Sequence, residues 1–174
     1  MPCDIGYRSV ARATVEKKTP AVKAPPKRVD EPLIVRLAAA DPAFVSWLRE
    51  LDAKPLLDTL QQGGVIDLLR MVCELLDYNV VVSENGKMLE AEKTTHSGEH
   101  HVHEYLCVVA KGDALEVRFE HFASDDALAV EQARFLALAQ KLGLTLRLSG
   151  EKRAGQKIPK GAVHPHLHKN RGKS

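Results

Sequence analysis

The chain has 174 residues, enough for one domain with a real hydrophobic core, and 44% of them are hydrophobic. Lys and Arg number 25 and Asp and Glu 23, so the formal net charge is +2. Four charged residues interrupt the most apolar stretch, 65–82, which excludes a membrane-spanning helix of about 20 apolar residues. No stretch resembling a signal peptide opens the chain, so we expect a cytoplasmic protein.

The charges are unevenly distributed. Residues 1–28 carry a net charge of +5 and residues 151–174 a net charge of +6, whereas residues 29–150 carry −9. This segregation favours a negatively charged partner for the two ends. We expect an N-terminal strand segment at 1–16, a Pro- and Lys-rich flexible linker at 17–32, an α+β core domain at 33–150 and a basic, disordered tail at 151–174.

The three cysteines, Cys3, Cys73 and Cys107, are far apart and form no CxxC pair. Their spacing excludes a zinc ribbon and a thioredoxin-like motif. Their odd number favours reduced thiols in a reducing compartment over a disulfide framework.

Helical patterns follow a strand and the linker. Residues 5–16 alternate with a period of two, which predicts a strand with one buried face. A short helix is expected at 33–40, and Asp41-Pro42 is typical of an N-cap followed by proline at the first helical position. The apolar stripe that follows is interrupted at Lys54-Pro55, and residues 65–76 form a clear amphipathic helix.

Two hairpins come next. Runs at 79–83 and 87–93 flank Asn85-Gly86, which predicts a type I′ turn and pairs Val82 with Leu89. We expect a loop at 94–100 and a second hairpin, 101–110 with 114–122, that pairs Val108 with Val117 and Glu104 with His121. Its buried face comprises Leu106, Val108, Ala110, Leu115, Val117 and Phe119. Its solvent face comprises His101, His103, Tyr105, Cys107, Glu116, Arg118 and Glu120.

A long helix capped by Ser124 or Asp125 runs to Leu142, where Gly143 ends it. A final strand follows at 144–148, and periodicity is lost from residue 149 onward. The order of elements predicts an α+β fold: a mostly antiparallel sheet of about five strands, with helices packed mainly on one face.

Histidines cluster around the second hairpin. His101 and His103 share one strand face near Glu120, and His96 or His100 can reach them from the predicted loop. Two imidazoles and a carboxylate are ligands that a divalent metal such as zinc accepts. The alternative interpretation is a set of solvated histidines, because the spacing matches no established metal motif.

The basic tail provides the other candidate site. Its cations include Lys152, Arg153, Lys157, Lys160, Lys169 and Arg171. A flexible cationic segment follows a phosphate backbone, and the absence of aromatic residues excludes base stacking. RNA, a ribonucleoprotein or an acidic protein surface are the expected partners. Because the core is acidic, no folded basic face is expected.

Phosphate-loop, dinucleotide-binding and serine-hydrolase motifs are absent from the sequence. The sequence therefore favours a non-enzymatic binding or assembly protein whose basic ends contact RNA, in the manner of a ribosome-associated protein, or an acidic partner. The alternative is a divalent-metal-binding protein or metal-dependent hydrolase that uses the His96–His103 cluster.

Overall fold

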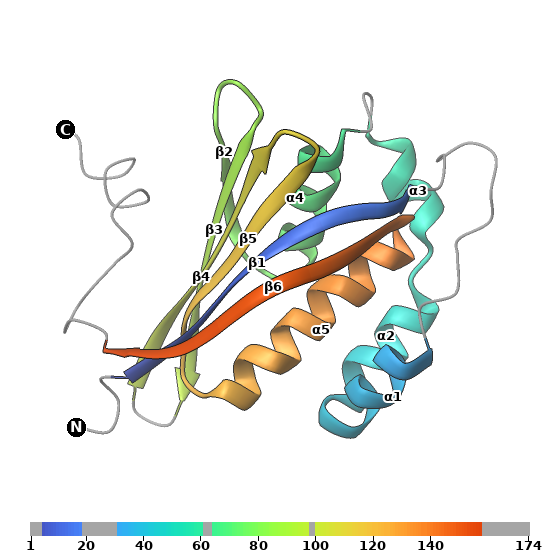
Figure 1. The fold of residues 1–174 in the computed structure, drawn as a ribbon. Coiled ribbons are helices and arrows are strands. Elements are labelled where there is room, and N and C mark those ends of the chain that lie inside the picture. The colour runs from blue at the N-terminus through green and yellow to red at the C-terminus, as the bar shows by residue number, and fades with distance from the viewer. Residues whose placement is uncertain (1–4, 19–30, 61–63, 98–99, 158–174) are drawn as a thin grey trace.

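The computed structural model describes residues 5–18, 31–60, 64–97 and 100–157. Over these residues the chain forms an α+β fold, with six strands in one sheet and five helices that cover one of its faces (Figure 1). The strands are β1 (Ile5–Lys18), β2 (Asn79–Val82), β3 (Met88–Ser97), β4 (His100–Lys111), β5 (Ala114–Phe122) and β6 (Leu144–Lys157). The helices are α1 (Glu31–Ala40), α2 (Pro42–Glu50), α3 (Ala53–Asp58), α4 (Val65–Leu75) and α5 (Asp125–Lys141). The predicted fold class is confirmed, and each of the six segments expected to form strands does so.

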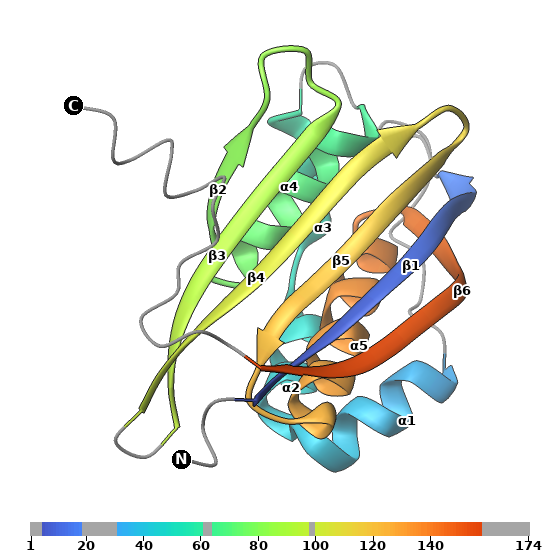
Figure 2. The ribbon, with the colours of Figure 1, turned by 60° about the vertical axis from the view of Figure 1, so that its left-hand side comes forward.

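The strand order is β2-β3-β4-β5-β1-β6, and all neighbouring strands in it are antiparallel. The first strand therefore lies between β5 and the last strand, so residues from the two ends of the described chain are neighbours. Figure 2 shows the sheet in front of the helices, with its other face free of helical cover among the described residues. No helix in this part of the chain is long and apolar enough to cross a bilayer.

Local signals in the sequence begin and end the helices. Asp41 accepts a hydrogen bond from the backbone N–H of Phe44 at 3.1 Å and caps α2, with Pro42 at its first position. Ser124 caps α5 in the same way through the N–H of Ala127. The expected interruption at Lys54-Pro55 is displaced: the break lies at 51–52, and Pro55 is tolerated in the first turn of α3, where its missing N–H has no helical partner.

The core lies between the sheet and the helices. Leu106, Val108, Val117 and Phe119 are buried on the face predicted for them, and two of the predicted pairings, Val108–Val117 and Val82–Leu89, are present. The ring of Phe119 meets that of Phe135 from α5 edge-on at 5.6 Å. Alternation along the strands was therefore sufficient to predict which face is buried.

The turn between β2 and β3 differs from the predicted type. Gly86 has φ 69°, but Asn85 does not adopt a positive φ, so the turn is not type I′. The N–H of Gly86 instead donates to the carbonyl of Ser83 at 2.9 Å, and Asn85 Oδ1 accepts from the N–H of Lys87. Glycine is still needed, because its left-handed conformation leads the chain back into β3.

Several predicted boundaries are wrong because tertiary pairing extends the strands. Residues 94–97 and 100 belong to β3 and β4, where a loop was expected. The last strand continues past Leu148 to Lys157, since β1 offers it a partner along its whole length. The predicted linker and tail otherwise fall mainly on 19–30 and 158–174, which lie outside the described residues.

The expected pairing of Glu104 with His121 is not formed. The pairing between β4 and β5 ends at Tyr105 and Glu120. His121 adopts φ 67°, and a register shift lies opposite it in β1 between Tyr7 and Ser9. A residue in this left-handed conformation interrupts the alternation, as a β-bulge does, so Phe122 returns to the core.

Candidate functional site

The helix-free face of the sheet carries a set of cations over β5, β1 and β6. We define the basic face as Arg8, Arg12, Arg118, Arg147 and Lys152. Their neighbours of opposite parity, Ala11 and Ala13, are buried against the helices, so alternation places these cations on the other side. The register sets Val10 between Arg118 and Lys152 and pairs Thr14 with Arg147. The prediction that no folded basic face exists is therefore wrong.

A bulge in β6 turns Glu151, the carboxylate next to Lys152 in the sequence, away from this face. Gly150 has φ 60°, and the register between β1 and β6 shifts between Val10 and Arg12. Glu151 consequently accepts hydrogen bonds from Ser9 Oγ at 2.6 Å and Gln132 Nε2 at 2.6 Å, a buried serine and a buried α5 side chain. The charge of Glu151 is thus held on the helical side, while the adjacent Lys152 lies with the arginines.

Two carboxylates of β5, Glu116 and Glu120, lie on the same side of the sheet as these cations. Glu116 pairs with both Arg118, at 2.8 Å, and Lys111, at 3.1 Å, and the charge of Glu120 also acts on Arg118. Hydrogen bonds and charge from Lys111 and Arg118 hold the pKa of Glu116 below its ordinary value. A hollow of about 430 Å³ adjoins Arg12, Lys111 and Lys152.

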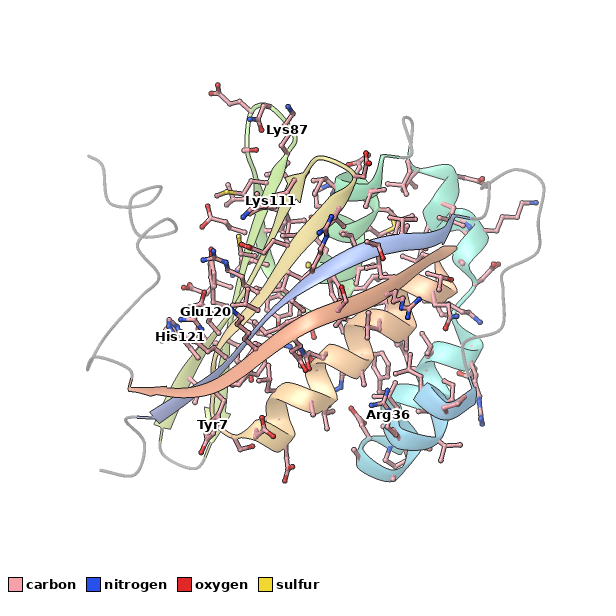
Figure 3. All side chains as sticks on the ribbon, in the orientation of Figure 1. Tyr7, Arg36, Lys87, Lys111, Glu120 and His121 are labelled. Atoms are coloured by element: carbon pink, nitrogen blue, oxygen red, sulfur yellow. The ribbon has the colours of Figure 1, made fainter. Side chains whose placement is uncertain are left out.

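The remainder of the helix-free face is less exposed than predicted. Tyr105 is 1% exposed, and its hydroxyl donates to Glu90 Oε2 at 2.8 Å. Cys107 and Glu120 are also buried, although all three were expected on the solvent face. Tyr105 and Cys107 pack with Met88 and Val109 in a small second cluster. The exposed cations of the basic face therefore lie toward β1 and β6. Figure 3 shows Lys111, Glu120 and His121 on the side of the molecule opposite Arg36 of α1.

The predicted tail cations are only partly within the described structure. Lys152 is exposed on the basic face, and the backbone of β6 carries Arg153 opposite Ser9 and Lys157 opposite Ile5. Lys160, Lys169 and Arg171 lie outside the described residues. Arg8 and Arg12 were not among the predicted site residues, although the alternation in 5–16 already placed both on the polar side of the first strand.

The predicted metal ligands are placed differently from the expectation. His96, His100 and His101 lie in strands, and their side chains are outside the description. Among the described side chains no group of three metal-binding residues is found. His103 Nδ1 is 3.2 Å from Thr94 Oγ1, and Glu120 is buried beside Tyr105.

On the helical side, a charged cluster joins the sheet to α5; it comprises Tyr78, Lys93, Glu104, Glu131, Arg134 and Asp41. Glu131 is 1% exposed and accepts hydrogen bonds from Tyr78, Lys93 and Arg134 at 2.7, 2.8 and 3.0 Å. Burial raises the pKa of Glu131, but the charge of Lys93 and these hydrogen bonds outweigh it and leave the pKa below its ordinary value.

The pKa of Glu104, another member of the charged cluster, shifts in the opposite direction. Burial, together with the charge of Glu131, raises the pKa of Glu104 to about 7, although Lys93 opposes this shift. Arg134 donates to Asp41 Oδ2 through Nε at 3.0 Å and Nη2 at 2.6 Å. The cations and carboxylates therefore satisfy one another, which indicates a structural role for the cluster in holding α2 and α5 on the sheet.

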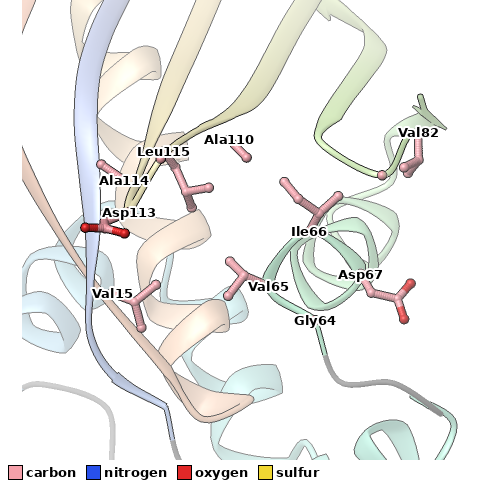
Figure 4. A pocket seen from close by; sticks show the side chains of 12 residues that line it. Val15, Gly64, Val65, Ile66, Asp67, Val82, Ala110, Asp113, Ala114 and Leu115 are labelled. Atoms are coloured by element: carbon pink, nitrogen blue, oxygen red, sulfur yellow. The ribbon is translucent and has the colours of Figure 1, made fainter. Parts of the chain in front are cut away.

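An apolar groove of about 500 Å³ lies between the first turn of α4 and the ends of β1, β4 and β5 (Figure 4). Val65 and Ile66 line one side, and Val15, Ala110 and Leu115 line the other. Two carboxylates, those of Asp67 and Asp113, line the groove, and no described histidine or cysteine does so. The groove therefore offers hydrophobic contact, and its described lining includes no combination of catalytic side chains.

The two described thiols are poor nucleophiles. Burial raises the pKa of Cys73 strongly, with further contributions from Glu131 and Glu74. Burial also raises the pKa of Cys107. The thiolate, which is the reactive form, is disfavoured in both cases.

No protein-family model matches the chain, and no curated protein matches it either.

Proposed function

We propose that this chain is a non-enzymatic RNA-binding protein that uses its basic face, and the basic segment that follows it, to hold the phosphate backbone. The observation that carries the proposal is the gathering of Arg8, Arg12, Arg118, Arg147 and Lys152 on the helix-free face of β5, β1 and β6. Strand β6 leads directly from this face into residues 158–174, which add further cations in sequence.

The charge balance of the face supports this proposal. Arg12 and Lys152 are exposed, and neither forms an ion pair with a described carboxylate. Exposed cations of this kind attract phosphates, and the release of condensed counterions drives binding. The side chains of this face on β1 and β6 include no aromatic residue, so bases have no stacking platform there. Binding is therefore expected to be independent of base sequence.

The proposal is tested by fluorescence anisotropy with a labelled single-stranded RNA of about 20 nucleotides at low salt, using the full chain. We expect R12E/K152E to weaken binding at least tenfold, because two attractive contacts become repulsive. The matched control is R36E, which reverses an exposed arginine on α1, in the helical layer (Figure 3).

A comparison with acidic peptides decides between the two kinds of negative partner. Tight binding of polyglutamate with little binding of RNA would overturn the proposal in favour of an acidic protein partner. Equal loss of RNA binding in R36E and R12E/K152E would also contradict it, since the helical layer would then contribute as much as the basic face.

A further inference from the structure

The free ends of β3 and β4 bring three histidines into register. Residue pairing continues to the end of this hairpin and sets His96 directly opposite His101 and Thr94 opposite His103. From the sequence, His96 was expected in a loop. In the structure it is the cross-strand partner of His101, and His103 follows two residues farther along the same strand.

All three positions belong to the helix-free face. Leu89 and Ala91 of β3, and Leu106 and Val108 of β4, are buried against the helices, so residues of the other parity fall on the opposite side. The contact of 3.2 Å between Thr94 Oγ1 and His103 Nδ1 agrees with this assignment. His100 pairs with Ser97 and has the opposite parity, which places it on the other face.

The spacing of these positions suits one metal ion. Residues directly opposite each other in an antiparallel pair have Cβ atoms about 4.5–5.5 Å apart. Residues i and i+2 of a strand are about 7 Å apart on one face. His96, His101 and His103 thus define a triangle of positions from which three imidazoles can bind one ion, with Zn–N bonds of about 2.0–2.1 Å.

Thr94 adds an orienting contact. With Nδ1 of His103 directed at the threonine hydroxyl, Nε2 of the same ring is the nitrogen left for a ligand. A hydrogen bond on the nitrogen that does not bind the metal is the usual arrangement for a histidine ligand, because it sets the tautomer and the orientation of the ring.

We propose that His96, His101 and His103 form a zinc site at the free end of the β3–β4 hairpin, with the fourth coordination position open to water or to a donor from another molecule. This site goes beyond the proposed RNA binding and uses a different part of the helix-free face. It replaces the ligand set expected from the sequence, because Glu120 is buried on β5 opposite Tyr105 and His100 has the opposite parity in β4.

The test is a titration of the full chain with Zn²⁺ against a competing chromophoric chelator. Three variants are compared with the wild type: H96A/H101A, H100A and H164A/H166A/H168A. We expect the wild type to bind one tight equivalent of Zn²⁺, and H96A/H101A to bind it at least tenfold more weakly. The neighbouring H100A substitution and the triple substitution in the C-terminal segment should leave this equivalent unchanged.

Far-UV circular dichroism and the melting temperature of each metal-free variant establish that it folds. Addition of Zn²⁺ should raise the melting temperature of the wild type and of H100A, but not that of H96A/H101A. The proposal is overturned if H100A is as damaging as H96A/H101A, if the tight equivalent is lost with the C-terminal histidines, or if the wild type binds no tight equivalent.

Discussion

Lys93 Nζ lies 2.8 Å from Glu131 Oε2 and joins the middle of β3 to the middle of α5. The same ammonium group donates to the carbonyl of Leu76 at 3.1 Å and lies 4.5 Å from the centre of the Tyr78 ring. One cation thereby connects the sheet, the long helix and the connection after α4. These contacts offset the free-energy cost of removing the Lys93 ammonium group from water. Loss of either Lys93 or Glu131 is therefore costly, because it leaves the other charge buried without this partner.

Replacing Glu131 with glutamine should strongly destabilise the fold. The substitution removes the buried carboxylate charge that pairs with both Lys93 and Arg134, so we expect the free energy of unfolding to fall by about 3 kcal/mol. Urea denaturation measures the change. The control is E74Q, which removes an exposed i,i+4 pair with Arg70 and should cost less than about 0.5 kcal/mol. Similar costs for the two variants would show that the cluster does not hold α5.

Glu104 should make the protein less stable as the pH rises from 5 to 8. Its pKa is raised to about 7 in the folded chain, above its ordinary value of 4.5. Between these two values the folded state holds a proton that the unfolded state has released, so the free energy of unfolding falls with rising pH. At about 1.4 kcal/mol per pKa unit, the decrease is of the order of 3 kcal/mol.

The substitution E104Q tests this dependence, because glutamine does not titrate. Denaturation at pH 5, 6, 7 and 8 should give E104Q a flatter profile than the wild type, with its relative stability highest at pH 8. An unchanged slope would mean that another group is responsible. The lowered pKa of Glu131 acts at lower pH, where its protonation removes stability as the pH falls below about 4.5.

Asp41 performs two tasks that substitutions can separate. Its Oδ1 caps α2 through the N–H of Phe44, while Oδ2 accepts two hydrogen bonds from Arg134. D41N keeps an oxygen for the cap and loses the charge, so we expect a loss of about 1 kcal/mol in the free energy of unfolding. D41A also loses the cap and should cost about 1 kcal/mol more.

Asp52, the exposed cap of α3, provides the reference for a cap without an ion pair, and D52A should cost about 1 kcal/mol or less. Equal stabilities of D41N and D41A in thermal or urea denaturation would argue against a separate capping contribution.

RNA binding should weaken steeply with salt, and the steepness should report the cations involved. For single-stranded nucleic acid, the slope of log K against log salt concentration is about −0.7 per phosphate neutralised. R12A/K152A should therefore make the slope shallower by about 1.4, whereas R36A should leave it unchanged. Anisotropy titrations from 50 to 200 mM salt measure it. An equal slope in R12A/K152A and the wild type would remove these two residues from the contact surface.

Much of the fold was predictable from local patterns. Alternation in 101–122 assigned the buried face and the pairing of Val108 with Val117, because a shift of one residue would invert every side chain. Asp41-Pro42, Ser124 and Gly143 marked helix boundaries through hydrogen bonds and backbone preferences that act within a few residues.

The sites were harder to predict because they combine segments that are distant in sequence. Arg12 and Lys152 become neighbours only when β1 inserts between β5 and β6, a pairing of strands that local pattern does not specify. Lys93 and Glu131 likewise come from segments that are distant in sequence, and no local pattern predicted their ion pair. His96 joins His101 only because strand pairing extends through a polar stretch with no apolar alternation to reveal it.

The sequence by itself determined the α+β class, the capped helices and the buried side of each hairpin, since hydrophobic period and capping are properties of neighbouring residues. The tertiary structure decided where the first and last strands lie, how far β3, β4 and β6 extend, and which charges meet. The physical reason is that a strand satisfies its backbone hydrogen bonds through a partner elsewhere in the chain, so its length, its neighbours and the face it completes depend on that partner.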